Sequence, residues 1–115
     1  MKPSSAKAKG RLFQQKVRDK ILSTFPKLLP EDVRSTSMGA GGEDILLSPY
    51  ARGEFNYSVE CKKKASFAIY KDYDQAKANC PAGVVPLVAF EGNRREAMVC
   101  LSMDDFFSLL VKEEE

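Results

Sequence analysis

The sequence contains no histidine and no tryptophan, and it has only three cysteines, at positions 61, 80 and 100. Without an imidazole, the chain cannot build a Ser–His–Asp or Cys–His nucleophile, a His-ligated zinc site or a histidine acid–base pair. An odd number of widely spaced cysteines argues against a disulfide framework and favours buried, reduced thiols in a cytoplasmic protein. Any catalysis is therefore expected from carboxylates, amides, hydroxyls, lysines or thiols.

Long apolar runs are also missing, so we expect no membrane-spanning segment. The 115 residues are 43% hydrophobic and 30% charged, which is typical of one globular domain. The net charge is only +2, but residues 1–20 carry seven basic groups and one acid, whereas residues 101–115 carry five acids and one lysine. We expect a flexible basic arm at 1–9, a single domain at 10–111 and an acidic tail at 112–115.

Hydrophobic periodicity predicts eight elements along the chain. An apolar side chain recurs every four residues on the first helix, which Pro26 ends: Phe13, Val17, Ile21 and Phe25. Strands are expected at 33–37, 43–48, 55–62, 84–90 and 96–101, and further helices at 67–79 and 106–111. Ser102, three residues before Asp105, predicts a capping box for the last helix. The order α-β-β-β-α-β-β-α predicts an α/β fold with a central mixed sheet flanked by helices.

The expected strand 55–62 has apolar residues at its odd positions and polar residues at its even positions. Exposure of one strand face to water explains such a pattern without any function. However, Asp44 begins the preceding strand, and the connection is short enough for a hairpin that brings Asp44 near Glu60 and Lys62. Two carboxylates beside a lysine suit a hard cation such as Mg²⁺, which generates a nucleophilic hydroxide without histidine.

These residues carry a resemblance to a known superfamily. Asp44 followed by Glu60-Cys61-Lys62 resembles the signature of the PD-(D/E)XK nucleases. Further matches make the chain most similar, over residues 9–101, to archaeal and phage Holliday junction resolvases: Lys9-Gly10-Arg11, Arg34-Ser35 before a glycine-rich loop, and Gln75 on the helix after the lysine. The resemblance implies a restriction-endonuclease-like core and a homodimer that cuts four-way DNA junctions in a prokaryotic or phage-infected cell.

The resemblance also implies individual roles. Asp44 and Glu60 would hold Mg²⁺, which Mn²⁺ can replace, with the backbone carbonyl of Cys61 as a further ligand, and Lys62 would orient the attacking water. The candidate DNA contacts are basic, hydroxyl or amide side chains: Lys9, Arg11, Arg34, Ser35, Lys63, Lys64 and Gln75. Such groups read the shape and backbone of DNA rather than its base sequence.

One position departs from the resolvase pattern, which has a glutamate four residues after the Lys-Gly pair. This chain has Gln14 there. An amide oxygen ligates Mg²⁺ or holds a metal-bound water but brings no negative charge. Gln14 is therefore an additional candidate ligand, and either a second metal binds weakly or the cut differs.

The sequence leaves other functions open. The same fold can act on flaps, nicks or single strands as a phage nuclease, or it can bind DNA without cleaving it. A third alternative is a structural protein whose acidic C-terminal residues dock a partner.

Overall fold

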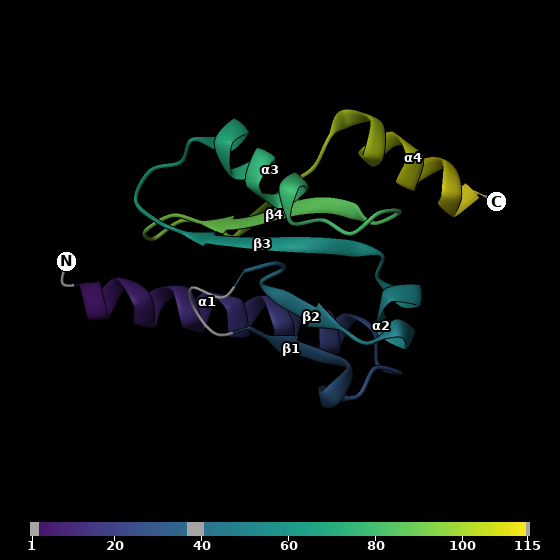
Figure 1. Cartoon of the computed structure of the whole chain (residues 1–115), viewed down its shortest axis with the longest axis horizontal. Coiled ribbons are helices and arrows are strands. Elements are labelled where there is room, and N and C mark those ends of the chain that lie inside the picture. The colour runs from purple at the N-terminus through teal and green to yellow at the C-terminus, as the bar shows by residue number, and fades with distance from the viewer. Residues whose placement is uncertain (1–2, 37–40, 115) are drawn as a thin grey trace.

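The computed structural model describes residues 3–36 and 41–114 (Figure 1). Four helices and five strands follow one another in the order α1 (Pro3–Thr24), β1 (Val33–Ser35), β2 (Ile45–Leu47), α2 (Pro49–Glu54), β3 (Tyr57–Lys63), α3 (Ile69–Ala78), β4 (Val85–Glu91), β5 (Met98–Cys100) and α4 (Met103–Glu114), with a 3₁₀ turn at Pro30–Asp32. The predicted class, a mixed α/β fold with a small mixed sheet flanked by helices, is confirmed.

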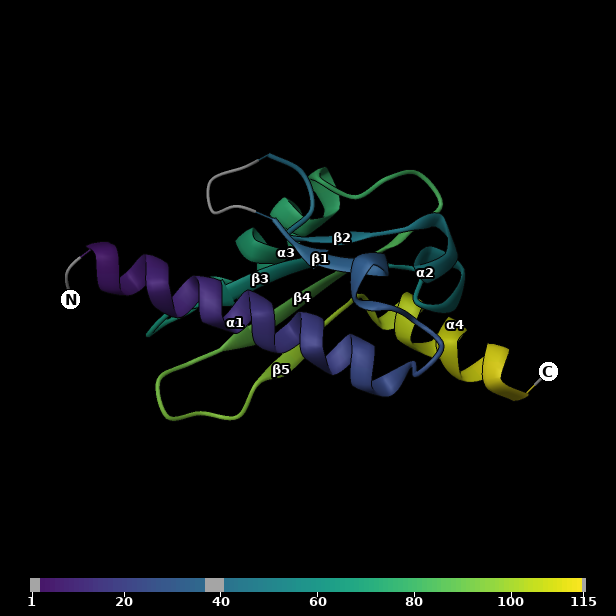
Figure 2. The ribbon, with the colours of Figure 1, turned by 90° about the horizontal axis from the view of Figure 1, so that it is seen from below.

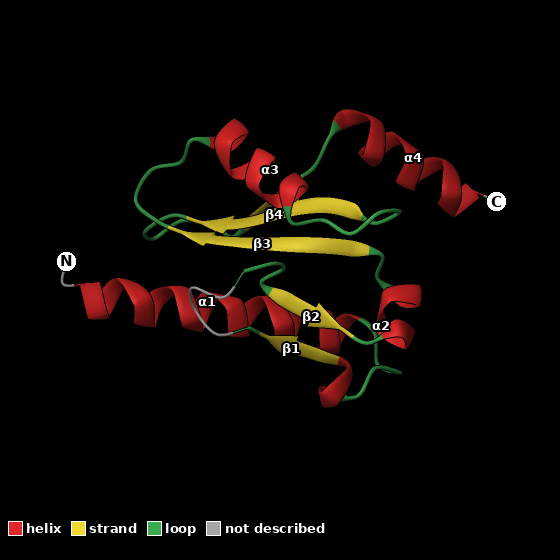
Figure 3. Cartoon of the chain, viewed as in Figure 1, coloured by secondary structure: helices red, strands yellow, loops and turns green. Residues whose placement is uncertain are grey.

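The strands form a pair and a triplet (Figure 3). β1 and β2 pair antiparallel, with Ser35 opposite Ile45. In the triplet, β4 lies between β3, to which it is parallel, and β5, to which it is antiparallel. β2 lies next to β3, and the backbone N–H of Asp44 donates to the carbonyl of Val59 at 3.2 Å.

Helices cover both faces of β3. α1 packs against β1 and β3 on one face, and α3 packs against β3 and β4 on the other (Figure 1). Seen from below, α1 runs obliquely along the triplet (Figure 2). The hydrophobic core lies between α1 and the strands, and its buried members include Phe13, Ile21, Val33, Ile45, Val59, Leu87 and Ala89. The residues repeating every four positions in α1 thus face the sheet, as predicted.

The two ends of the chain are more helical than predicted. α1 begins at Pro3, inside the expected arm, because alanine and lysine are good helix formers that let the helix extend N-terminally. α4 begins after Ser102, whose hydroxyl accepts from the Asp105 N–H at 3.0 Å as predicted, and it continues to Glu114. Residues 3–9 and 112–114 therefore continue helices.

The connection between β2 and β3 differs from the expected hairpin. It contains α2, which Ser48 caps by accepting the Ala51 N–H at 3.1 Å, while Pro49 occupies the first helical turn. Within the described residues, β2 forms a ladder with β1 and none with β3. The predicted β2–β3 hairpin is therefore wrong, although the two strands still lie next to each other.

Candidate functional site

Asp44 is fixed against the middle of β3 by two backbone hydrogen bonds. Its N–H donates to Val59 at 3.2 Å, and its Oδ2 accepts from the N–H of Cys61 at 2.7 Å. The carbonyl of Asp44 in turn accepts from the Thr36 N–H at 2.9 Å, which ties it to the end of β1. Asp44 therefore comes close to Glu60 because it bonds to the edge of β3 that does not pair with β4, and not because β2 and β3 form a hairpin.

The polar face of β3 is covered by protein. Ser58 is 2% exposed and Glu60 is 5% exposed, because the even positions of this strand face α3. This burial rejects the explanation that the alternating pattern reflects contact with water. A buried carboxylate is unfavourable unless it gains hydrogen bonds, a counter-charge or a metal, so the position of Glu60 calls for one of these.

Burial and proximity raise the pKa values of both acids. Loss of solvation raises the pKa of Asp44, and the hydrogen bond from Cys61 opposes that rise. Loss of solvation also raises the pKa of Glu60, the charge of Asp44 raises it further, and Lys62 opposes both effects. Two neighbouring carboxylates that resist ionisation gain from a proton or from a bound cation. The pair therefore has the electrostatic character of a cation site.

Lys62 and α3 complete the surroundings of Glu60. The Nζ of Lys62 lies 3.7 Å from Glu60 Oε1 and donates to Gln75 Oε1 at 2.7 Å. Asn79 Nδ2 donates to Glu60 Oε2 at 3.5 Å. Asn79 caps the C-terminal end of α3, four residues after Gln75, so the two side chains lie on the same side of this helix end. The sequence reasoning missed Asn79, although its spacing from Gln75 on the predicted helix is a usable signal.

The oxygen atoms available here fit Mg²⁺ or Mn²⁺. In a strand, the N–H and C=O of one residue point to the same edge, so the Cys61 carbonyl faces the same edge as Asp44. Mg²⁺ prefers oxygen ligands and commonly uses one or two carboxylates with waters and substrate phosphates. In the described part of the chain, no group of three or more acids and cysteines is arranged for a metal. A metal held by Asp44 and Glu60 therefore takes its remaining ligands from the backbone, water or substrate.

Gln14 is buried on α1, at 5% exposure, and its Oε1 has no hydrogen-bond partner among the described residues. A buried amide oxygen without a partner is unfavourable in a dry core, and a cation or a water satisfies it. No hydrogen bond joins Gln14 to Asp44 or Glu60 in the described residues. Gln14 therefore remains a candidate ligand, with its orphaned oxygen in its favour.

Cys61 is a free, partly buried thiol, in agreement with the predicted reduced cysteines. Burial, and then the charges of Asp44 and Glu60, raise the pKa of its thiol far above the ordinary value. The side chain packs against the hydrophobic core. Cys61 therefore stays protonated at neutral pH and offers its backbone, rather than its sulfur, to the site.

The candidate DNA contacts divide into separate groups. Arg34 and Ser35 lie on β1 and line a hollow of about 470 Å³ together with α1 residues, including Gln15 and Arg18. Arg11 is exposed on α1 and makes no ion pair with any residue in the described ranges 3–36 and 41–114. No hydrogen bond or ion pair joins Arg34, Ser35 or Arg11 to Glu60 or Lys62 within the described residues. Of the candidate DNA contacts in the described residues, Gln75 is the one linked to the carboxylate site, through its hydrogen bond with Lys62.

The lysines after Lys62 already have partners. Lys63 Nζ lies 2.8 Å from Glu91 Oε1, on the face opposite Lys62. Lys64 Nζ lies 3.0 Å from Asp72 Oδ1 and 5.7 Å from the centre of the Phe67 ring. Asp72 is a buried acid that the sequence reasoning did not single out, and its Oδ2 has no partner in the described residues. Lys64 is therefore bound to α3, and its phosphate contact stays a prediction.

No protein family, curated protein or solved structure matches this chain. Within the described residues, none of the helices combines the length and apolar character needed to cross a bilayer. Function is therefore inferred from the geometry of the Asp44–Glu60–Lys62 site.

Proposed function

We propose that this protein is a metal-dependent DNA endonuclease that resolves four-way junctions. The observation that carries the proposal is the meeting of Asp44, Glu60 and Lys62 at β3, with the Glu60 carboxylate buried and Asp44 partly buried. A purely structural role gives no reason to place a buried acid beside a second, partly buried acid when a single lysine, 3.7 Å from Glu60, compensates them. A bound cation and a phosphodiester substrate would account for these acids.

The proposed fold is the restriction-endonuclease-like core. The β1–β2 pair and the β3–β4–β5 triplet are separate sheets that a backbone hydrogen bond from Asp44 to Val59 links side by side. In the proposed core the two act as one sheet. α1 on one face and α3 on the other then flank the strands that carry the acids. With α2 as an insertion between β2 and β3, the element order agrees with the order expected from the resemblance.

The proposed chemistry assigns each group a task. When bound, Mg²⁺ supplies Lewis acidity and lowers the pKa of water. Asp44 and Glu60 hold the cation, and Asn79 keeps the Glu60 carboxylate in place. The Lys62 ammonium orients the attacking water and stabilises the charge that develops on the phosphoryl oxygens. Gln75 holds Lys62 at 2.7 Å and so restricts the ammonium to this position.

We also propose that the active form is a homodimer. Large apolar side chains remain exposed on β5 and α4, including Val99 at 59% and Phe107 at 56%. Val99 lines an apolar groove of about 1250 Å³ between α1, the sheet and α4, to which α4 contributes Phe106 and Leu109. Contiguous exposed apolar patches commonly mark interaction surfaces. A two-fold dimer covers this surface and presents two active sites to a two-fold substrate such as a four-way junction.

Cleavage of a labelled four-way junction with Mg²⁺ tests the proposal, with duplex, flap and single-stranded DNA compared in parallel. We expect paired, symmetrical nicks in the junction. Glu60→Gln should abolish them, whereas Glu54→Gln should not, because Glu54 is exposed and its side chain has no partner in the part of the chain that the structure describes. No Mg²⁺-dependent cleavage by the wild type, or equal cleavage by Glu60→Gln, contradicts the proposal.

The same assay separates the alternatives. Preferred cleavage of flaps, nicks or single strands selects a general phage-type nuclease of the same fold. Binding without cleavage that Glu60→Gln leaves unchanged selects a non-catalytic DNA-binding module. Neither alternative has an observation in its favour that the junction-resolving nuclease lacks.

A further inference from the structure

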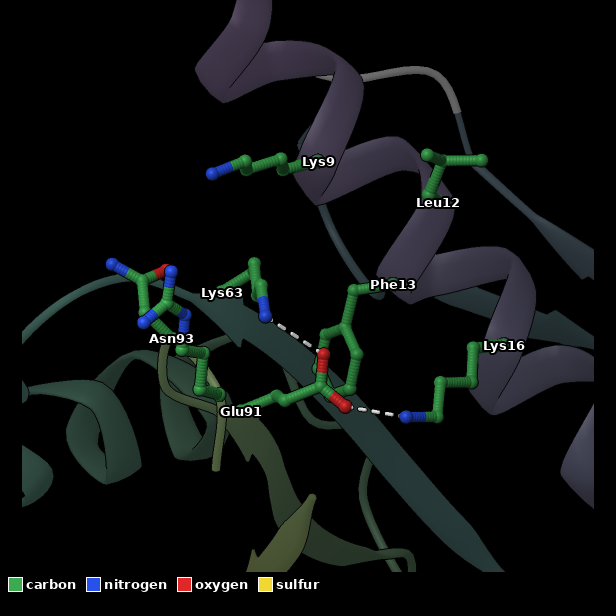
Figure 4. Close-up of a pocket in the computed structure, with 8 residues that line it drawn as sticks. Lys9, Leu12, Phe13, Lys16, Lys63, Glu91 and Asn93 are labelled. Carbon is green, nitrogen blue, oxygen red and sulfur yellow. Dashed lines mark hydrogen bonds and ion pairs between the residues drawn. The ribbon is translucent and has the colours of Figure 1, made fainter. Parts of the chain in front are cut away.

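A second charged feature lies away from the carboxylates, in a groove of about 690 Å³ between α1 and the turn that joins β4 to β5 (Figure 4). α1 supplies Lys9, Leu12, Phe13 and Lys16, which are spaced so that they share one side of the helix. The opposite wall comes from the ends of β3 and β4 and from the turn: Lys63, Glu91, Asn93 and Arg94. Segments far apart in the sequence thus meet around one groove.

The groove holds four basic side chains and one acid. Glu91 binds two of the cations, Lys16 and Lys63, and both interactions appear as dashed lines in Figure 4. These two ammonium groups lower the pKa of Glu91, so it stays ionised at neutral pH. Lys9 and Arg94 have no ion pair or hydrogen bond among the described residues. The groove therefore has an excess of positive charge that an anion can neutralise.

The turn places Arg94 in an unusual backbone conformation. Its φ is 56°, in the left-handed region, and among the described residues it is the sole non-glycine residue with a positive φ. Side chains disfavour this region, and residues held there concentrate at ligand-binding and active sites. The Arg95 N–H donates to the Gly92 carbonyl at 3.3 Å and closes the turn. Arg94, the residue with the left-handed backbone, is thus also one of the two groove cations, with Lys9, that have no partner among the described residues.

The groove and the carboxylate site share the C-terminal end of β3. Successive side chains of a strand point to opposite faces. Lys62 accordingly reaches Gln75 of α3, whereas Lys63 reaches Glu91 on the side of α1. A polyanion that crosses this end of β3 therefore meets the groove on one side and the carboxylates on the other.

We propose that this groove binds a backbone phosphate of DNA at a distance from the cleaved bond, and that Glu91 occupies it when DNA is absent. Lys9 and Arg94 contact the phosphate directly. Lys16 and Lys63 join them when the phosphate displaces the Glu91 carboxylate. The inference rests on the proposed function for its ligand, DNA, but not on cleavage. It adds Lys16, Glu91 and Arg94 to the residues that determine DNA affinity.

Equilibrium binding of a fluorescent four-way junction to the full-length Glu60→Gln protein tests this groove without cleavage. Adding Lys9→Gln and Arg94→Gln together should weaken binding about 10-fold and lower the slope of log affinity against log salt by about 1, since the loss of one neutralised phosphate removes about 0.9. The matched control adds Lys27→Gln and Lys77→Gln, which remove two exposed cations elsewhere and should change binding less than about 2-fold. Thermal unfolding verifies that each variant is folded.

The substitution Glu91→Gln should change DNA affinity in the opposite direction. Releasing Lys16 and Lys63 from their acid should tighten binding several-fold and steepen its salt dependence. Equal binding by the groove and control variants, or weaker binding by a folded Glu91→Gln protein, overturns the groove proposal even if the wild type cleaves junctions. Groove-dependent binding with no cleavage by the wild type instead keeps the groove and overturns the nuclease. No binding of any DNA overturns both.

Discussion

The Asp44 carboxylate accepts a hydrogen bond from the backbone N–H of Cys61 at 2.7 Å. This contact holds an acid that precedes β2 against the middle of β3, beside the acid that β3 itself carries, Glu60. The resulting pair is compensated by Lys62, which α3 holds through Gln75. Cation binding, water positioning and restraint of the lysine all depend on this arrangement.

Removing the charge of Glu60 should stabilise the metal-free protein at neutral pH. Because burial and Asp44 raise the pKa of Glu60, its ionisation disfavours the folded state as pH rises through the raised pKa. Glu60→Gln avoids that penalty, so we expect its Tm in EDTA to exceed that of the wild type by about 3 °C near pH 7. Below about pH 4 the Glu60 carboxyl of the wild type is protonated and neutral, like the glutamine of the variant. The difference in Tm should therefore disappear.

Circular dichroism melts over this pH range measure the difference, with Glu54→Gln as the matched control. A Glu60→Gln protein that is less stable than the wild type near neutral pH contradicts the electrostatic account. So does a difference in Tm that is independent of pH.

Lys62 should act directly on the reaction, and Gln75 should act through Lys62. We expect Lys62→Met to lower kcat for junction cleavage about 100- to 1000-fold, as loss of a group that stabilises the transition state does. Gln75→Ala should lower kcat about 10-fold and leave KM nearly unchanged, because it frees Lys62 to move. Asp74→Asn, at the neighbouring exposed position of α3, serves as the control. A Gln75→Ala protein that changes KM alone would instead assign Gln75 to DNA binding.

Gln14→Glu tests whether the orphaned amide oxygen belongs to the metal site. A glutamate in this buried position should lower the Tm in EDTA, since it adds an unpaired charge to a dry environment. Mg²⁺ should restore the Tm, and the Mg²⁺ dependence of cleavage should change sharply. Thermal melts with and without Mg²⁺ measure the first effect. A loss of stability that Mg²⁺ does not repair, with unchanged metal dependence of cleavage, shows that Gln14 plays no part.

The apolar surface on β5 and α4 should mediate dimerisation. Introducing a charge there with Val99→Lys or Phe107→Lys should convert the dimer into a monomer, as measured by light scattering during size-exclusion chromatography. Tyr70→Lys is the matched control, since Tyr70 is 84% exposed on α3, away from this surface. A wild type that is monomeric at micromolar concentration refutes the dimer. Dimers that persist in both surface variants place the interface elsewhere.

Part of this site was predictable from local sequence. The acids and lysine of the pattern were identified, and the alternation within 55–62 located β3 to within a few residues. Asp44 was expected to approach Glu60 and Lys62 through a β2–β3 hairpin, which does not form. The expectation failed because Ser48-Pro49 fits both a turn and the start of a helix. Here it begins α2, and tertiary packing rather than a hairpin brings β2 to β3.

Other features depend on which distant segments pack together. The burial of Ser58 and Glu60 follows from α3 crossing that face, which the pattern within β3 does not contain. Likewise, Lys63 meets Glu91 because β4 lies parallel to β3, with these two residues in register. Local periodicity carries no information about such pairings, so the sequence did not reveal the groove between α1 and the β4–β5 turn.

The most direct test of the central claim is the anomalous scattering of Mn²⁺ in crystals of the wild-type protein grown at saturating metal. We predict a peak in contact with one carboxylate oxygen each from Asp44 and Glu60, at about 2.0–2.3 Å. The Cys61 carbonyl should lie among its remaining ligands. The peak should be absent from Glu60→Gln crystals grown in the same way. Wild-type crystals in which the two acids face each other with no metal between them contradict the account.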